Sequence, residues 1–308
     1  MYLIEGKRIW VAGHNGMVGH AVVRALTDRD CTILTVPRQE VDLTRQSEVE
    51  VWINEVKPDA IIICAAKVGG ILANSTYPAD FLYDNIMIEA NIIHAAYSQN
   101  VEKLLFLGSS CIYPKFAAQP IREDALLTGS LEATNEYYAI AKIAGIKLCE
   151  AYRKQHGCDF ISAMPTNLYG PFDNFDLETS HVIPALLRKA HEAKLEGRQV
   201  MEVWGSGNAR REFLHVDDCA DGMLFILENY SDHSHVNLGS GVDVTIREMA
   251  EKICEVVGFE GDIIYDNSKP DGTPRKLLNI QEIKKLGWKS QISLLDGIKD
   301  TYRYYSSQ

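Results

Sequence analysis

The sequence predicts an α/β protein built on a doubly wound parallel sheet, with a smaller C-terminal α/β region. Short apolar runs alternate with helical patterns through the first half of the chain. Several of these runs are continuously apolar, which is typical of parallel strands buried on both faces. After residue 165 the pattern changes to shorter elements separated by stretches rich in glycine and proline. The length of 308 residues and the 46% hydrophobic content suit one large domain or two modest ones.

The first half supplies the predicted strands and the helices between them. The strand-like runs, in chain order, are RIWVAG, CTILTV, AIIICAA, KLLFLGSS and DFISAMPTN. Helical patterns lie near residues 17–28, 47–56, 77–100 and 137–156. Pro78 suits the first turn of the third helix, because proline is favoured at a helix N-terminus. The alternation of strand and helix predicts crossover connections and hence a parallel sheet.

The change of pattern also predicts the domain boundaries. Residues 1–165 are expected to form a dinucleotide-binding domain of the Rossmann type, with part of 208–240 returning to it. Residues 166–207 and 241–308 are expected to form the substrate-binding region. Mixed polar stretches such as NLYGPFDNF and DNSKPDGTPRK mark this second part.

Charge and cysteine content exclude several classes of partner. The net charge of −11 argues against long nucleic acid, which needs a basic field. The seven cysteines show no CxxC or zinc-ligand spacing, so we expect reduced thiols, a cytoplasmic protein and no metal. The N-terminus lacks the features of a signal peptide, and no apolar run approaches the roughly 18 residues of a membrane span.

A glycine loop follows the first predicted strand. In VAGHNGMVGHAVVRAL, Gly13, Gly16 and Gly19 stand at the opening of a helix. Glycine permits a tight turn and close approach of a pyrophosphate, and the helix N-terminus supplies free amides. We therefore expect the loop to bind a dinucleotide through Gly13, Gly16 and Gly19 together with His14, Asn15, Met17 and Val18.

The end of the second strand indicates which dinucleotide binds. NAD-binding sheets often carry an acid about 20 residues past the loop, but here Val36 and Pro37 are followed by Arg38. A cation at this point suits the 2′-phosphate of NADP, although Arg38 could instead be a solvated surface residue. Asp42 and Leu43 are expected to border the adenine.

A tyrosine and a lysine lie four residues apart in NEYYAIAKIAG. Tyr138 and Lys142 share one face of the predicted helix. The ammonium is expected to lower the pKa of the phenol, which can then exchange a proton with a carbonyl oxygen. Ser109 is the expected third member and Ser110 the alternative, which the residues alone do not separate. Tyr137 is expected to point away and pack.

With these motifs the chain resembles the extended short-chain dehydrogenase/reductase family over essentially its whole length. The glycines of the loop have the spacing GxxGxxG, which is typical of that family, rather than GxGxxG. The matching motifs are AGHNGMVG, AAKVGGI (65–71), YPADF (77–81), LLFLGSSCIYPK, NEYYAIAKIAG, MPTNLYGP, SHVIPALLRK (180–189), VWGSG, REFLHVDD and PDGTPRK. Asn15 departs from the family, since some relatives carry arginine there, and this leaves more of the NADP preference on Arg38.

The resemblance implies an epimerase role for Cys111 and His181. Carbons beside a ketone have acidic protons, and inversion needs proton exchange plus stabilisation of an enolate oxygen, which Tyr138 and Ser109 can supply. Unperturbed thiol and imidazole pKa values are about 8.5 and 6.5, so both groups can exchange protons at cellular pH. The alternative is a buried packing thiol and a helix-capping histidine.

The resemblance also implies the remaining contacts. Substrate is expected to meet Lys189, Trp204, Arg211 and Asp271, with Arg188 as a further candidate for the diphosphate. The alternatives are solvated charges and a core tryptophan. Cofactor is expected to contact Ala65, Ala66, Lys67, Pro165, Thr166, Asn167, Leu168 and His181, in addition to Tyr138 and Lys142.

The activity that the resemblance implies is NADPH-dependent epimerisation at C3 and C5, and reduction at C4, of GDP-4-keto-6-deoxy-D-mannose. A homodimer through the helices near 77–100 and 137–156 is expected by analogy. One alternative is a related keto-sugar enzyme acting on a dideoxy sugar. Another is a non-catalytic dinucleotide-sensing regulator, which typically lacks the tyrosine or the lysine.

Overall fold

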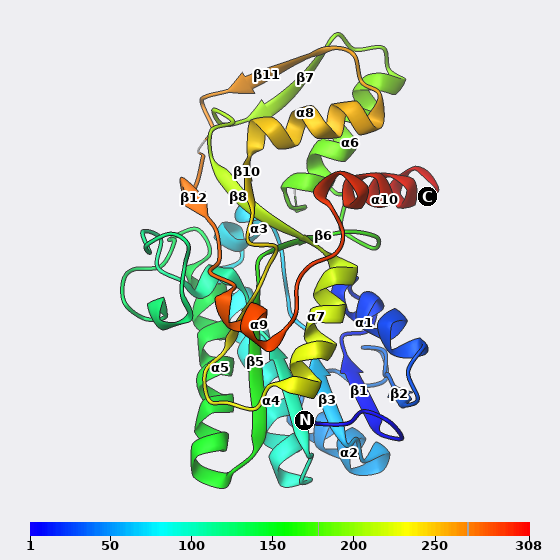
Figure 1. Ribbon diagram of the computed structural model, residues 1–308, viewed down its shortest axis with the longest axis vertical. Helices are drawn as coiled ribbons and strands as arrows, with labels where there is room; N and C mark the ends of the chain where they lie inside the picture. Colours follow the sequence, from blue (N-terminus) through cyan, green and yellow to red (C-terminus); the bar gives the residue numbers. More distant parts are fainter. Residues whose placement is uncertain (178, 270) are drawn as a thin grey trace.

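A six-stranded parallel sheet forms the centre of the larger part of the chain, drawn below the C-terminal region in Figure 1. The computed structural model describes residues 1–177, 179–269 and 271–308. Pro270, the first residue of the PDGTPRK motif, lies outside the described residues. The strand order is β2-β1-β3-β4-β5-β9. The strands are β1 (Arg8–Ala12), β2 (Thr32–Leu34), β3 (Ala60–Ile63), β4 (Lys103–Leu107), β5 (Asp159–Pro165) and β9 (Val236–Leu238).

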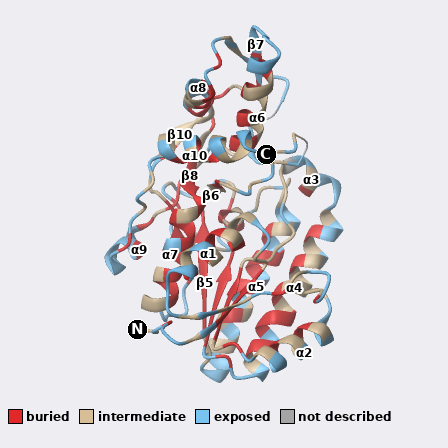
Figure 2. Cartoon of the chain, turned by 90° about the vertical axis from the view of Figure 1, so that its right-hand side faces the viewer, coloured by how far each residue is buried: buried red, intermediate tan, exposed pale blue. Residues whose placement is uncertain are grey.

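Helices cover both faces of this sheet, so the predicted doubly wound architecture is confirmed. Figure 2 shows α1 and α7 on one face and α2, α4 and α5 on the other, with buried residues concentrated between them. The helices are α1 (Met17–Thr27), α2 (Gln46–Val56), α4 (Pro78–Ser98), α5 (Glu136–His156) and α7 (Val216–Asn229). All residues of β3 and β4 are buried, which agrees with their apolar sequences; the one charged residue, Lys103, pairs with Asp159 at 2.9 Å.

The local sequence explains how the predicted helices begin and end. Pro78 starts α4, and Gly157 ends α5 with φ +72°, a left-handed conformation that glycine adopts without strain. The prediction missed the short helix α3 (Ile71–Thr76) and the 3₁₀ turns η1 (Ser110–Ile112) and η2 (Glu123–Ala125). These segments are too short to give a helical period in the sequence.

The C-terminal region has its own sheets and a separate apolar core. Strand β8 lies between β10 and β12 and also pairs with β6, while β7 pairs with β11. The strands are β6 (Asn167–Tyr169), β7 (Val200–Trp204), β8 (Arg210–His215), β10 (Asp243–Thr245), β11 (Asp262–Asp266) and β12 (Arg275–Lys276). The helices are α6 (Val182–Leu195), α8 (Ile246–Val257), α9 (Gln281–Leu286) and α10 (Leu294–Ser306).

The chain passes between the two parts more than once. It leaves the larger sheet after β5, forms β6 to β8, and returns through α7, which packs on α1, and through β9, which pairs with β5. The C-terminal region therefore faces the carboxyl ends of the central strands (Figure 1). In such sheets ligands bind at this edge, where the strand order reverses. No helix in the described parts of the chain has the length and hydrophobicity needed to span a membrane.

Candidate active site

The glycine loop lies at the carboxyl end of β1, where the three glycines have different surroundings. Gly13 has φ +88°, and a Cβ there would lie 2.6 Å from the backbone nitrogen of Ala65. A Cβ at Gly19 would overlap the carbonyl oxygen of Gly13. A Cβ at Gly16 would meet only that same oxygen, at 3.6 Å. Gly13 and Gly19 thus allow the turn to close, and Gly16 leaves an open approach to the backbone.

The N-terminus of α1 fits an anionic ligand. Gly16 is its N-cap, no side chain caps its amides, and its first turn holds no acidic residue. Exposed N–H groups and the helix dipole together favour a phosphate at this position. His14, on the same loop, has its pKa lowered by burial, which favours the neutral ring.

The two candidate serines, which follow β4, differ in burial and in their contacts. Ser110 is buried, with 3% of its surface exposed, whereas Ser109 is partly exposed and caps η1. The Ser109 hydroxyl accepts a hydrogen bond from the amide of Cys111 at 3.3 Å and interacts with the hydroxyl of Tyr138. Ser109 is therefore the serine that faces the tyrosine.

Lys142 lies on α5 and is completely enclosed by protein. Its ammonium donates to the carbonyl oxygen of Leu107 at 3.1 Å and lies 4.6 Å from the centre of the Phe106 ring. Glu89 on α4 faces it, with 3.9 Å between Oε2 and Nζ. Burial lowers the pKa of Lys142, and burial raises that of Glu89 to about 8 although the ammonium opposes this shift. Glu89 was not among the site residues predicted from the sequence.

The pKa of Tyr138 differs from the prediction. Burial raises it, and the nearby Cys111 and Glu89 raise it further, while the Ser109 hydroxyl offsets part of the shift. The predicted lowering by Lys142 is therefore wrong for the protein by itself, because desolvation of the phenolate dominates. Tyr137 was expected to pack, but 45% of its surface is exposed.

Cys111 is a partly exposed thiol in η1, next to the serine and tyrosine. Its sulfur accepts a hydrogen bond from Asn135 Nδ2 at 3.2 Å, and Lys276 Nζ lies 3.6 Å away. These contacts are polar, so the interpretation as a buried packing thiol does not fit. Asn135 and Lys276 were not predicted, because they join Cys111 only through the tertiary fold.

His181 is the N-cap residue of α6, but its side chain makes no capping hydrogen bond. The alternative of a helix-capping histidine therefore does not fit. The side chain is exposed to solvent, yet enough protein surrounds it for desolvation to lower its pKa, and the charge of Lys276 lowers it further. The neutral imidazole is favoured as a result.

The predicted adenine-side residues lie beyond β2. Arg38 is exposed, while the Asp42 carboxylate accepts hydrogen bonds from the amide and hydroxyl of Thr44 at 3.0 and 2.8 Å. The carbonyl of Leu43 accepts a hydrogen bond from Asn91 at 3.0 Å. Asp42 thus shapes its own turn, and Arg38 remains at the surface beside it.

The loop after β3 is fixed by α4. The Asn85 carboxamide accepts from the Lys67 amide at 2.9 Å and donates to its carbonyl at 3.0 Å. The Lys67 ammonium pairs with Asp84 and Asp80 at 2.9 and 3.1 Å. Ala65 packs against Gly13, and Ala66 follows it on the same loop. The side chain of Lys67 is therefore directed to α4.

The segment after β5 connects the two parts of the molecule. Thr166 and Asn167 both donate to the carbonyl oxygen of Glu212 on β8, at 3.2 and 2.7 Å. Pro165 ends β5, and Leu168 pairs with Leu214 in the β6–β8 ladder. These bonds hold residues 165–168 at the carboxyl edge of the central sheet.

Two of the four predicted substrate residues lie at the edge formed by α6 and β7. Trp204 is 53% exposed, which excludes a core tryptophan, and the ammonium groups of Lys189 and Lys269 lie 5.0 and 5.3 Å from its ring centre. Desolvation lowers the pKa of Lys189. Arg188 pairs with Glu192 at 2.7 Å and donates to the carbonyl of Phe175, so its guanidinium is already engaged.

The other two, Arg211 and Asp271, contact each other. Arg211 donates to the carbonyl oxygen of Asp271 at 3.3 Å, and desolvation lowers the pKa of its guanidinium. Both Asp271 carboxylate oxygens accept from Ser206, at 2.7 Å from its amide and 2.8 Å from its hydroxyl. Arg211 also interacts electrostatically with Cys111, which links the cations predicted to bind substrate to the residues that follow β4.

Comparison with known proteins places the fold and the motifs in one family. The model of the NAD dependent epimerase/dehydratase family matches residues 9–239. A GDP-L-fucose synthase of Sinorhizobium fredii is 60% identical over 307 residues, covering 100% of this chain and 98% of that protein.

Solved structures agree with this assignment. The crystal structure of a GDP-6-OMe-4-keto-L-xylo-heptose reductase from C. jejuni has a TM-score of 0.94 and 37% identity, covering 98% of each chain. A GDP-mannoheptose C4 reductase from Campylobacter jejuni with NADP bound has a TM-score of 0.91 and 38% identity, covering 99% of this chain and 100% of that one. The resemblance drawn from the sequence motifs is confirmed, and the chain belongs to the NAD-dependent epimerase/dehydratase family of extended short-chain dehydrogenases.

Proposed function

We propose that this protein converts GDP-4-keto-6-deoxy-D-mannose to GDP-L-fucose, by epimerisation at C3 and C5 followed by NADPH-dependent reduction at C4. The observation that carries the proposal is the position of the Cys111 thiol beside the Ser109–Tyr138 pair. A ketone held by the serine and tyrosine hydroxyls would then lie next to a group able to exchange the adjacent C–H protons. The 60% identity to a GDP-L-fucose synthase supports the same substrate and product.

The epimerisation is proton exchange at the carbons beside the ketone. At each carbon, one of Cys111 and His181 takes the proton from one face and the other, in its protonated form, gives a proton to the opposite face, so that the carbon inverts. As the C–H bond breaks, its electron pair moves to O4, and the hydroxyls of Ser109 and Tyr138 stabilise that developing oxyanion. Because burial lowers the pKa of His181, its protonated form gives up a proton readily.

The reduction uses the same oxygen contacts. NADPH supplies the hydride for C4, and Tyr138 gives the proton to O4. Lys142, one helical turn after the tyrosine, contributes a buried ammonium and a hydrogen-bond donor for the nicotinamide ribose. Because burial keeps the Tyr138 phenol protonated, the residue begins this step as an acid.

The cofactor-binding residues follow from the fit of the glycine loop. We assign the pyrophosphate to the open backbone at Gly16 and to the uncapped amides of α1, within the segment Gly13–Gly19. The adenosine side falls to Arg38, Asp42 and Leu43. The nicotinamide side falls to Ala65–Lys67 and Pro165–Leu168, together with Tyr138, Lys142 and His181.

Replacing Arg38 with alanine is expected to raise the KM for NADPH by about tenfold and to leave that for NADH nearly unchanged. The reason is that only NADPH carries a 2′-phosphate for the guanidinium to bind, and a charge-assisted hydrogen bond of this kind contributes about 1.5 kcal/mol. Steady-state kinetics with both cofactors measure the ratio, and Arg45→Ala, another exposed arginine on the same surface, is the control. Equal changes for the two cofactors would remove Arg38 from this role.

The GDP moiety is assigned to the C-terminal region, residues 166–207 and 241–308. Lys189 and Arg211 would bind the diphosphate, Trp204 would present its exposed ring to the guanine or the sugar, and Asp271 would contribute its remaining acceptor capacity. Residues 1–165 and the returning α7–β9 segment would hold the dinucleotide.

We further propose a cytoplasmic homodimer. Tyr83, Tyr137 and Ile140 expose apolar surface on α4 and α5, at 63%, 45% and 40%. A second copy packing on these helices would cover that surface. The cysteines of the described chain are all free, which suits a reducing compartment.

The test of the function is the mass of the product formed in heavy water. Incubation with GDP-4-keto-6-deoxymannose and NADPH is expected to give a reduced sugar carrying two solvent deuteriums on carbon, one for each inverted centre. A reduced sugar without deuterium would favour the second candidate, a C4 ketoreductase without inversion. That candidate is supported by the likeness to the two Campylobacter reductases. No NADPH oxidation with any keto-sugar would contradict both and favour a dinucleotide-sensing regulator.

A further inference from the structure

Lys276 brings a charge from the C-terminal region to the thiol at the end of β4. It lies on β12, the two-residue strand that pairs in parallel with β8, where Lys276 stands opposite Arg211. Its ammonium nitrogen is 3.6 Å from the sulfur of Cys111, although the two residues are 165 positions apart. Neither the sequence motifs nor the proposed function gives this lysine a role.

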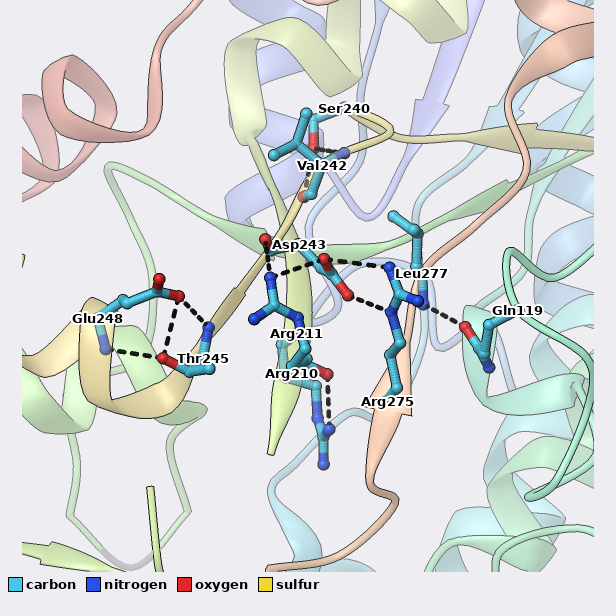
Figure 3. Close-up of polar contacts among 10 residues, drawn as sticks. All are labelled: Gln119, Arg210, Arg211, Ser240, Val242, Asp243, Thr245, Glu248, Arg275 and Leu277. Atoms are coloured by element: carbon cyan, nitrogen blue, oxygen red, sulfur yellow. Dashed lines mark hydrogen bonds and ion pairs between the residues drawn. The ribbon is translucent and has the colours of Figure 1, made fainter. Parts of the chain in front are cut away.

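The backbone on both sides of Lys276 is anchored. Figure 3 shows the Arg275 guanidinium directed to the Asp243 carboxylate, with 2.5 Å between Nε and Oδ2. It also shows the amide of Leu277 donating to Gln119 at 2.9 Å. The amide of Leu278 donates to the buried Glu212 at 2.8 Å. Lys276 is therefore presented by a fixed strand.

The anchors also join β12 to the segment that follows Cys111. Gln119 accepts from the Leu277 amide, and the amide of Ile121 donates to the Leu277 carbonyl at 2.7 Å. Both partners lie within ten residues of the cysteine in the chain. Lys276 and Cys111 are consequently held by one hydrogen-bonded unit that spans the two parts of the molecule.

The charge of Lys276 is available to the sulfur. In residues 1–177, 179–269 and 271–308, no carboxylate forms an ion pair with Lys276. The other groups that face Cys111 are Asn135, the N-cap residue of α5, Tyr138 on α5 and Arg211 on β8. Asn135 donates a hydrogen bond, and Arg211 adds a second positive charge. The neighbours of the sulfur thus include one amide donor and two cationic side chains.

We propose that Lys276 is a positioning residue that stabilises Cys111 as the thiolate and thereby prepares it to take the substrate proton. The role of the thiolate in catalysis rests on the proposed function. In the step itself the S–H bond forms as the C–H bond breaks, and the electron pair moves to O4 of the ketone. Lys276 acts through the sulfur and takes no part in proton transfer.

Alkylation of Cys111 by iodoacetamide tests this without turnover. Only the thiolate reacts, so the rate at each pH, read by mass spectrometry of the Cys111 peptide, reports its population. Replacing Lys276 with methionine keeps the length of the side chain and removes the charge. We expect alkylation about tenfold slower at neutral pH and a pH profile displaced upward by about one unit. Lys276→Arg is expected to restore most of the rate.

Lys285→Met is the matched control, because it removes the same charge from an exposed pair with Glu282 on α9. It is expected to leave the alkylation profile of Cys111 unchanged. The proposal would be overturned if Lys276→Met had the same dependence of alkylation rate on pH as the wild type. It would also be overturned if Lys276→Met and Lys285→Met shifted this dependence equally. Alkylation needs no substrate, so its result does not depend on the proposed function. The proposed function is tested separately, by the deuterium content of the product that the wild-type protein forms in heavy water.

Discussion

Tyr138→Phe is expected to lower the rate of ketone reduction about 10³-fold. Phenylalanine keeps the ring, which packs edge-on to Phe81, and removes only the hydroxyl that interacts with Ser109. Without it, O4 loses its proton donor and one of its two stabilising contacts, and a positioned acid contributes about 10² to 10⁴ in rate. Single-turnover oxidation of bound NADPH measures the effect directly.

Tyr137→Phe is the matched control for that experiment. It makes the same chemical change one residue earlier on α5, at a side chain that is 45% exposed and lies about 100° around the helix from Tyr138. Its reduction rate is expected to equal that of the wild type. NADPH affinity should be similar in both variants, because each keeps the aromatic ring and all the other residues assigned to the cofactor. A Tyr138→Phe protein that reduces at the normal rate would show that O4 receives its proton elsewhere.

Cys111→Ser is expected to abolish inversion while leaving reduction measurable. A serine hydroxyl has nearly the same shape, but it does not ionise in this pH range, so Lys276 and Asn135 would face a neutral oxygen. The incorporation of solvent deuterium into recovered substrate should fall at least about 10²-fold. The reduced product should then carry no deuterium at C3 or C5.

Cys158→Ser serves as the control, since Cys158 is another partly exposed thiol, beyond the far end of α5. It is expected to give the doubly deuterated product at the normal rate. If Cys111→Ser also gave that product, the thiol would have no part in proton exchange. The contacts of Cys111 with Asn135 and Lys276 would then be structural.

The sequence predicted the frame of the molecule because the frame depends on local patterns. The apolar runs became β1 to β5, and the four helical patterns became α1, α2, α4 and α5 within two residues at each end. The sixth strand, β9 (VNL), was not predicted, because its three residues include an asparagine and no longer apolar run surrounds them. The glycine loop and the Tyr138–Lys142 spacing were predictable for the same reason, since each motif lies within one turn or one helix.

The electrostatics of the site could not be predicted from these patterns. Four-residue spacing places Lys142 and Tyr138 on one face, but it says nothing of Glu89, which arrives from α4. Nor does it say how deeply the phenol is buried, and burial reversed the expected direction of the Tyr138 pKa. Desolvation depends on the packing of several elements, which no single stretch of sequence encodes.

The sequence by itself determined the central sheet, the glycine loop before α1, and the candidate site residues from Ser109 to His181. The tertiary structure decided which of Ser109 and Ser110 faces Tyr138, and that Cys111 lies 3.6 Å from the Lys276 ammonium. The physical reason is the distance along the chain over which each effect acts. Propensity and periodicity act over a few residues, whereas charge and burial act through space between residues that the fold alone brings together.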